Sequence, residues 1–222
     1  MNDLCVVFDI DDTLYLEHDY AMSGFAAAGE WAGSWAGVAD FGEKCQEAYL
    51  AGQRGRIFDS VLAASGVQPV PELVAALVGI YRAHVPRIGL CEDAAEALSS
   101  IAGRCPVAVI SDGPAISQSR KAEALQLARF ASPICLTELF GAGCGKPSPV
   151  VFEAVRRATE KRHYVYIADN PLKDFTAPLQ LGWTAIRVRR PRGLHAALDN
   201  TVAQPHFELP DCTGLKNLLL NL

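Results

Sequence analysis

The chain has 222 residues, of which 50% are hydrophobic and 20% are charged, and its formal net charge at pH 7 is −5. This length suits one domain or a domain with an insertion, and the composition is that of a globular rather than a disordered protein. The negative charge argues against electrostatic binding to nucleic acid or to a membrane surface. The sequence has neither a membrane-spanning stretch nor a signal-peptide pattern, and we therefore expect a cytoplasmic protein.

The first predicted element is a buried strand, Leu4–Phe8, which is short, apolar and rich in valine. Carboxylates follow it at once, at Asp9, Asp11 and Asp12. Side chains alternate between faces in an extended segment, so Asp9 and Asp11 project the same way. Because neighbouring carboxylates repel each other and are costly to bury unpaired, this strand end predicts a bound cation or another polar site.

The stretch from residue 15 to residue 88 lacks strand patterns and is rich in helical ones. Its candidate helices are Ala21–Ala39, Phe41–Leu50, Ile57–Ala64 and a segment that begins at Pro71. Proline suits the first position of a helix, and apolar residues recur after Pro71 at a spacing of three to four. We therefore predict a helical domain over residues 15–88, inserted into a core formed by residues 1–14 and 89–222.

From Glu92 onward the sequence alternates between helix and strand patterns. Helices are predicted at Glu92–Ala102, Ile116–Ala128, Pro149–Thr159 and Leu172–Leu181, and strands at Pro106–Ile110, Pro133–Leu136, Tyr164–Ala168 and Thr184–Val188. This alternation is typical of an α/β fold with a parallel sheet covered on both faces. Residues 189–204 are irregular and are predicted to be a surface loop, followed by a strand at His206–Leu209 and a helix at Leu215–Leu220.

Polar residues end three of the predicted strands, at Asp9, Ser111 and Asp169. The carboxyl ends of parallel strands lie at one edge of the sheet, so these residues are expected to converge. Asp174 follows Asp169 closely, and such an acid pair suits Mg²⁺, which binds through few carboxylates and also takes a phosphate oxygen. Lys146 lies just before a helix, next to backbone-fixing prolines, where its ammonium can compensate negative charge.

These segments, in this order, resemble the four motifs of the haloacid dehalogenase superfamily. Asp9-Ile10-Asp11-Asp12-Thr13 is similar to the DxDxT first motif, and the apolar segment ending in Ser111 is similar to the second. The loop of Lys146 resembles the third motif, and Asp169 with Asp174 resembles the fourth. The resemblance implies a Rossmann-like core, and most members of the superfamily are phosphatases.

The resemblance also implies a role for each motif residue. Asp9 would attack phosphorus to give an aspartyl-phosphate, and Asp11 would protonate the leaving alcohol and then activate the hydrolytic water. Lys146 would offset negative charge in the site. The residues expected around the phosphoryl group are Ser111, Asp112, Gly113 and Thr13, of which Thr13 would orient its loop. The expected Mg²⁺ ligands are Asp9, the main-chain carbonyl of Asp11, Asp169 and Asp174.

The helical insertion occupies the position of the superfamily's first cap type, the C1 type. Such caps close over the active site, exclude water and select the substrate. Arg54 and Arg56 lie in a polar, glycine-rich loop of the insertion and are candidates for contact with a substrate anion. The alternative interpretation is that they are surface arginines at a helix end. The expected partner is a small phosphorylated substrate, and the sequence predicts neither a particular ester nor an oligomeric state.

Other activities on the same fold compete with this prediction. A 2-haloacid dehalogenase uses an aspartate nucleophile without a metal, and the presence of Asp11, Asp169 and Asp174 argues against it. A phosphonatase needs a cap lysine, for which Lys44 is the only candidate in the insertion. A phosphomutase is chemically close, whereas a non-catalytic binding module would be expected to lack Asp9 or the motif lysine. We therefore predict a Mg²⁺-dependent phosphatase.

The seven cysteines are scattered and form no CxxC pair, so a zinc site is not expected. Most lie beside apolar residues, as buried thiols in a reducing compartment do. Cys144 differs because it lies between Gly143 and Gly145. An ordinary loop cysteine is the simpler interpretation of Cys144, and a reactive thiol is the alternative.

Overall fold

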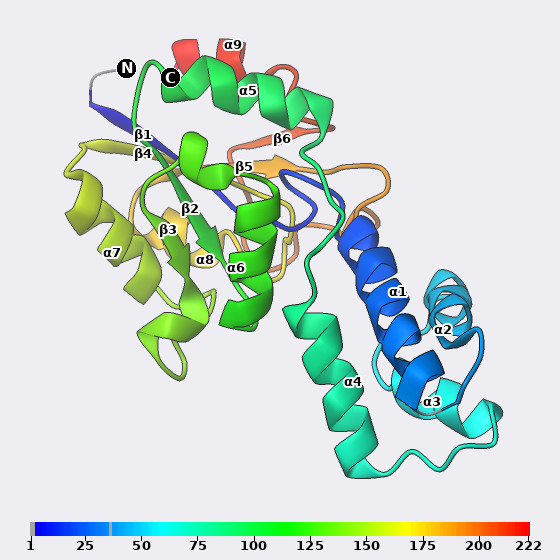
Figure 1. Cartoon of the computed structure of the whole chain (residues 1–222). Coiled ribbons are helices and arrows are strands. Elements are labelled where there is room, and N and C mark those ends of the chain that lie inside the picture. The colour runs from blue at the N-terminus through cyan, green and yellow to red at the C-terminus, as the bar shows by residue number, and fades with distance from the viewer. Residues whose placement is uncertain (1–2, 36) are drawn as a thin grey trace. The chain divides into compact units, whose positions relative to one another are not determined.

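The computed structural model describes residues 3–35 and 37–222 (Figure 1). The chain divides into two compact units, one formed by Met1–Glu17 with Ile88–Leu222 and the other by His18–Arg87. We call the first the core unit and the second the cap unit. Residues 1–2 of the predicted core and Ala36 of the predicted helix Ala21–Ala39 lie outside the described residues.

The core unit is built on a parallel sheet, with six strands in the described part of the chain and the order β3-β2-β1-β4-β5-β6. Every neighbouring pair is parallel. The strands are β1 Leu4–Phe8, β2 Val107–Ser111, β3 Ile134–Leu136, β4 His163–Ala168, β5 Thr184–Val188 and β6 Phe207–Leu209. The predicted α/β fold with a parallel, Rossmann-like sheet is confirmed. The direction of chain progression reverses between β1 and β4, and α/β proteins place ligands outside the strand ends at such a point.

Helices cover the sheet and explain why its central strands β1 and β2 are almost entirely apolar. One buried cluster joins Val7 and Ile110 on the sheet to Phe152 of α7 and Phe175 before α8. Val6 and Phe8, which point to the opposite face by alternation, are equally buried. The core helices are α5 Glu92–Ala102, α6 Ala115–Ala124, α7 Val150–Thr159, α8 Thr176–Gln180 and α9 Leu215–Leu220. Figure 1 shows α9 lying beside α5.

The cap unit consists of helices around an apolar and aromatic core of its own. The helices are α1 Glu17–Trp35, α2 Phe41–Leu50, α3 Ile57–Ala64 and α4 Pro71–Ala83. Two glycines allow α1 and α2 to approach closely: a Cβ at Gly42 would lie 2.7 Å from the Phe25 carbonyl oxygen, and one at Gly29 would lie 2.7 Å from the Gly42 Cα. The Phe41 and Phe58 rings stack in the same core, with their centroids 5.9 Å apart.

Three helices differ from their predicted bounds by more than one residue. Helix α1 covers Glu17–Trp35 rather than the predicted Ala21–Ala39. Helix α6 ends at Ala124 because Gln126 takes a left-handed conformation with φ 53°, after which residues 127–129 form a 3₁₀ turn. Helix α8 is shorter than the predicted Leu172–Leu181, because residues 170–175 form a turn held by their own side chains. In that turn the Asp174 Oδ2 accepts a hydrogen bond from the Asn170 main-chain N–H at 2.9 Å.

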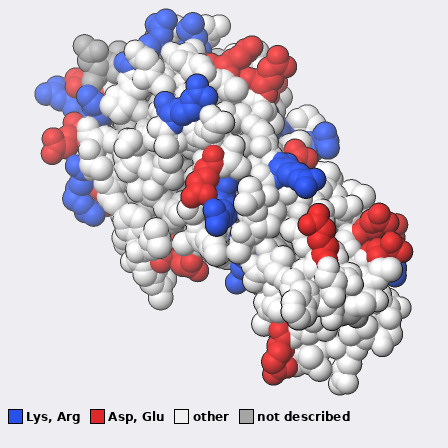
Figure 2. All heavy atoms as spheres, viewed as in Figure 1, with Lys and Arg blue, Asp and Glu red and all other residues white. Residues whose placement is uncertain are grey.

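Neither the described helices nor the face drawn in Figure 2 shows a feature typical of a membrane span or of a polyanion-binding surface. Among the described residues, no helix combines the length and apolar character needed to cross a bilayer. On the face that Figure 2 draws, acidic and basic side chains are scattered among uncharged ones rather than gathered by sign.

Candidate active site

Strand register brings the predicted motif residues to one edge of the sheet. Phe8 of β1 is paired with Val109 of β2 and with Ile167 of β4. Asp9 therefore follows β1 at the level where β2 ends in Ser111 and β4 runs into Asp169. The Asp9 main-chain N–H donates to the Ile167 carbonyl at 2.9 Å, which extends the ladder to the catalytic candidate itself.

Lys146 lies at the centre of a buried polar cluster. Its Nζ is 2.7 Å from Asp9 Oδ1 and 2.7 Å from Asp174 Oδ1, and it donates to the Tyr166 hydroxyl oxygen at 3.0 Å. These four side chains are 7% exposed or less. Burial lowers the pKa of the lysine, but Asp174 and Asp9 outweigh it and hold the pKa well above its ordinary value. The site thus contains a permanent ammonium beside the predicted nucleophile.

The loop of Lys146 is fixed by Asp112. Asp112 Oδ1 accepts a hydrogen bond from the Lys146 main-chain N–H at 3.1 Å, and its Oδ2 forms an ion pair of 2.8 Å with Lys173. Burial opposes ionisation of Asp112, but the two lysines prevail and lower its pKa. Asp112, predicted to lie near the phosphoryl group, therefore ties the loop of the third motif to the turn of the fourth.

The carboxylates at this edge form a set that fits Mg²⁺. One oxygen from each of Asp9, Asp169 and Asp174 lies within 4.8 Å of the others, and all three residues are buried. The pKa of Asp9 is raised to about 6, because burial and the neighbouring Asp174 raise it more than Lys146 lowers it. The pKa of Asp169 is raised to about 8, because burial and Asp174 raise it more than the hydrogen bond from His195 lowers it. One ammonium does not balance three buried carboxylates, and an all-oxygen donor set is the one that Mg²⁺ prefers.

Asp11 is held by a second polar network. Lys121 forms an ion pair with Asp11 Oδ1 at 2.7 Å, Tyr15 donates its hydroxyl hydrogen to the same oxygen, and Gln118 Nε2 donates to Asp11 Oδ2 at 3.0 Å. Burial raises the pKa of Asp11, but Lys121 and these hydrogen bonds outweigh it, so that the pKa lies below its ordinary value. Ser111 belongs to this network, because its hydroxyl donates to Gln118 Oε1 at 2.9 Å.

The two remaining phosphoryl-site candidates lie beside these networks. Gly113 has φ +125°, and a Cβ there would approach Gln118 Nε2 to 2.9 Å, so the position requires glycine. The Thr13 hydroxyl is buried, and within the described residues it has no hydrogen-bond partner. The Thr13 carbonyl instead accepts two hydrogen bonds from the guanidinium of Arg190, at 3.0 and 2.8 Å. Thr13 is thus held mainly through its backbone.

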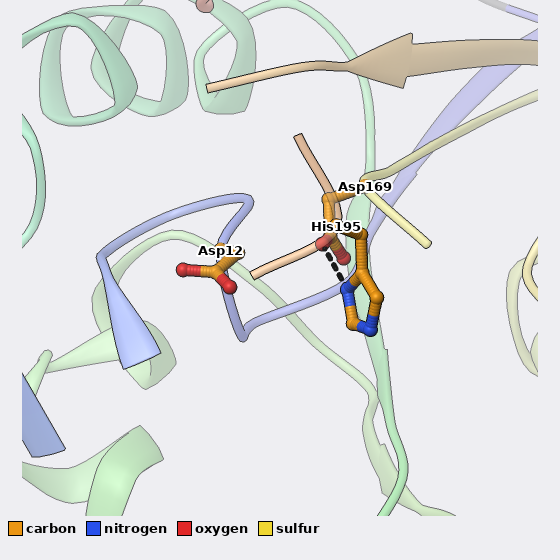
Figure 3. Close-up of side chains that lie close together, drawn as sticks. All are labelled: Asp12, Asp169 and His195. Carbon is orange, nitrogen blue, oxygen red and sulfur yellow. Dashed lines mark hydrogen bonds and ion pairs between the residues drawn. The ribbon is translucent and has the colours of Figure 1, made fainter. Parts of the chain in front are cut away.

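Residues 189–204, predicted to be an irregular surface loop, have no helix or strand in the structure, and they also contact the candidate site. His195 Nδ1 donates to Asp169 Oδ2 at 2.8 Å (Figure 3). The Leu194 N–H donates to Asp12 Oδ2 at 2.8 Å, and the Glu17 N–H donates to Asp12 Oδ1 at 2.9 Å. These bonds stabilise Asp12 at φ 52°, a conformation that aspartate tolerates better than most residues. The segment has no regular structure, so periodicity gave no sign of its role.

The cap arginines, by contrast, bond within the cap unit. Arg54 Nη1 donates to the Tyr49 and Gln53 carbonyls at 2.8 Å each, and its guanidinium lies 4.0 Å from the Tyr49 ring centre. Arg56 pairs with Asp59 at 3.2 Å and its side chain is 86% exposed. Both arginines line a hollow in the cap unit of about 300 Å³, together with the aromatic residues Phe25, Tyr49, Phe58 and Tyr81.

Fold and site together define an α/β core with a lysine-paired aspartate at the sheet's switch point. A family model described as haloacid dehalogenase-like hydrolase matches residues 4–182, and the chain belongs to this family and is a hydrolase. A glyceraldehyde 3-phosphate phosphatase from Methanopyrus kandleri is 28% identical over 222 aligned residues, which cover 92% of this chain and 91% of that protein.

Two solved structures show the same fold over the whole chain. A 2-haloacid dehalogenase from Pseudomonas syringae pv. Tomato has a TM-score of 0.68 and 22% identity, and covers 100% of this chain and 99% of its own. The putative hydrolase YfnB from Bacillus subtilis, solved bound to magnesium, has a TM-score of 0.69 and 15% identity, and covers 99% of both chains. At these identities the likeness concerns the fold alone.

Proposed function

We propose that the protein hydrolyses the phosphate monoester of a small metabolite through phosphorylation of Asp9. The observation that carries the proposal is the ion pair between Asp9 and Lys146, next to the carboxylates of Asp169 and Asp174. A nucleophilic carboxylate that attacks a phosphate dianion needs nearby positive charge, and this arrangement provides one cation and a place for a second. The phosphatase from Methanopyrus kandleri supports a phosphate ester as the substrate class.

In the proposed reaction Asp9 attacks phosphorus, and the bond from phosphorus to the leaving oxygen breaks. Asp11 gives a proton to that oxygen and afterwards takes one from the water that releases phosphate from Asp9. Asp11 is ionised in its contact with Lys121, so it is prepared for the second step. For the first step it must accept a proton and exchange its contacts with Lys121 and Tyr15 for one with the substrate.

The proposed cofactor is Mg²⁺, held by Asp9, Asp169, Asp174 and the main-chain carbonyl of Asp11. When bound, Mg²⁺ would polarise a phosphate oxygen and offset the charge of the carboxylates. Lys146 retains the Asp9 carboxylate in place, and Asp112 fixes the loop that carries Lys146. Tyr166 accepts a hydrogen bond from the same ammonium and limits its rotation.

A substrate panel tests this proposal against the rival activities. Purified protein with Mg²⁺ should hydrolyse an aryl phosphate and at least one of glyceraldehyde 3-phosphate, other sugar phosphates, phosphoglycolate and nucleoside monophosphates. Release of halide from a 2-haloacid, with no release of phosphate from any ester, would replace the proposal with dehalogenation. Transfer of the phosphoryl group to a second sugar hydroxyl, in place of its release, would indicate a mutase.

Substrate selectivity is proposed to reside in the cap hollow that Arg54 and Arg56 line. We expect Arg54→Ala to lower kcat/KM for the best natural ester by about tenfold and to change that for a small aryl phosphate by less than about twofold, because the aryl ester offers little remote binding energy. Kinetics of both substrates check this. Arg87→Ala is the matched control, since Arg87 is an exposed cap arginine that is not among the lining residues.

A uniform loss for both substrates, together with a lower Tm, would contradict the selectivity role of Arg54. Its bonds to the Tyr49 and Gln53 carbonyls would then have only a structural purpose. Tyr20 of α1 is a less suitable position for testing substrate selectivity by substitution. It is buried and donates its hydroxyl hydrogen to the Tyr81 carbonyl at 3.2 Å within the cap unit, so its loss would also disturb the packing of that unit.

A further inference from the structure

His195 contacts a predicted metal ligand from a part of the chain that the family model does not reach, since the model ends at residue 182. The imidazole is half-buried, and its Nδ1 lies 2.8 Å from Asp169 Oδ2 (Figure 3). No role follows for His195 from the four motifs.

The hydrogen-bond network fixes which ring nitrogen carries the proton. The Asn170 Oδ1 accepts a hydrogen bond from the Leu172 main-chain N–H at 3.0 Å, so the Asn170 amide nitrogen is the atom that faces the imidazole. That nitrogen donates to His195 Nε2 at 3.2 Å, so Nε2 is an acceptor. Nδ1 therefore carries the hydrogen and donates it to Asp169.

A buried arginine fixes the backbones on both sides of this contact. Arg187 of β5 is 0% exposed. Its Nε donates to the Asp169 carbonyl at 3.1 Å, and its Nη2 donates to the His195 carbonyl at 2.8 Å. One planar guanidinium thus holds the main chain of Asp169 and that of His195. The imidazole and the carboxylate therefore meet in a defined orientation, although His195 lies in an irregular segment.

The side chains around His195 do not form a second metal site. Asp12, Asp169 and His195 lie close enough for one, but both Asp12 oxygens already accept main-chain hydrogen bonds, from Glu17 and Leu194. Both imidazole nitrogens are also engaged, one with Asp169 and the other with Asn170. A cation there would have to displace the ring hydrogen that Asp169 accepts or the Asn170 amide from the imidazole, whereas the oxygen cluster of Asp9, Asp169 and Asp174 requires no such change around His195.

We propose that His195 is a positioning residue, which holds the Asp169 carboxylate in the rotation needed to bind the metal at the Asp9 cluster. This inference rests on the proposed Mg²⁺ site and goes beyond it, because it assigns a function to a residue outside the motifs. Partners of metal-binding side chains commonly change metal affinity by about 10–100-fold when they are removed. His195 does not touch the reacting atoms, so its removal should act on metal binding rather than on chemistry at saturating metal.

The test compares His195→Asn with His195→Leu. Asparagine places an N–H donor close to the position of Nδ1, whereas leucine has a similar size and no donor. The Mg²⁺ dissociation constant is measured by calorimetry, without substrate. We expect the leucine variant to bind Mg²⁺ about 10–100-fold more weakly and the asparagine variant to stay within about fivefold of the unmodified protein. At saturating Mg²⁺, kcat of the leucine variant should recover to within about threefold of that of the unmodified protein.

His163→Leu is the matched control, because His163 is an exposed histidine at the opposite end of β4 from Asp169. It should leave the Mg²⁺ dissociation constant unchanged. If His195→Leu does not fold, as judged by its Tm in chelator, His195→Ala takes its place. An unchanged dissociation constant in the donor-free variant would overturn the inference, and so would an equal loss in the asparagine variant. Absence of Mg²⁺ binding to the unmodified protein would overturn the metal assignment itself, and with it this inference.

Discussion

The Asp9→Asn variant should lose the proposed phosphatase activity by at least about 10⁴-fold, because an amide oxygen is a poor nucleophile and no covalent intermediate can form. Asparagine is nearly the same size, and Lys146 retains its ion pair with Asp174, so the fold should persist. Initial rates with an aryl phosphate at saturating Mg²⁺ measure the loss, and the Tm confirms the folded state.

Asp3→Asn is the matched control for this variant, since Asp3 is an exposed aspartate just before β1 and Asp9 directly follows the same strand. Its activity should equal that of the unmodified protein. If Asp9→Asn retained activity within about tenfold of the unmodified protein, the nucleophile would have to be another group or a water molecule.

Removal of Mg²⁺ is expected to have the second largest effect. Asp9, Asp169 and Asp174 are buried together with a single lysine, and a phosphate dianion would add further negative charge to that site. A bound metal supplies several kcal/mol of charge stabilisation in such reactions, so excess chelator should lower the rate by about 10³-fold or more. Readdition of Mg²⁺ should restore it.

The Asp174→Asn variant tests one of the proposed Mg²⁺ ligands. It removes one negative oxygen from the cluster, so a higher Mg²⁺ concentration should be needed for half-maximal activity. A titration of rate against Mg²⁺ measures the shift. Full turnover in excess chelator, with the metal content of the protein measured as zero, would contradict the metal assignment.

Much of the fold could be predicted because the core strands carry a strong local signal. The apolar run Leu4–Phe8 and the alternation after Glu92 predicted the parallel sheet, and helices Phe41–Leu50, Ile57–Ala64 and Glu92–Ala102 have the predicted bounds. Helix α8 was predicted too long, because its first predicted residues are held in a turn by Asn170 and Asp174 rather than by helical bonds.

The strand-end residues of the site could be predicted because parallel strands converge at one edge. Asp9, Lys146 and Asp174 meet as the motifs imply, and their catalytic and metal-binding roles stay predictions. Tyr166 was missed because an aromatic residue in a strand is usually part of the core, and its polar contact with Lys146 depends on a loop far away in sequence.

The partners of Asp11 were missed for a related reason. Gln118 and Lys121 lie one turn apart on α6, where polar residues usually indicate the solvent-facing side of a helix. Here both are buried, at 3% and 2% exposed, because Asp11 and Ser111 supply the partners that make burial possible. Such compensation between distant residues has no local pattern. His195 and Arg187 were missed likewise, since their contacts join irregular segments to the sheet edge.

The central claim is that Asp9 becomes phosphorylated during turnover, and intact mass of the Asp11→Asn variant under substrate tests it most directly. An aryl phosphate has a good leaving group that needs little protonation, so Asp9 should still be phosphorylated in this variant. Without the carboxylate base the intermediate should break down slowly and accumulate. We predict a mass increase of one phosphoryl group, located by peptide mapping to the segment containing Asp9 and absent from the double variant that also carries Asp9→Asn. If hydrolysis proceeded while no phosphorylated protein ever formed, or if the group were found on another residue, catalysis through a phosphorylated Asp9 would be contradicted.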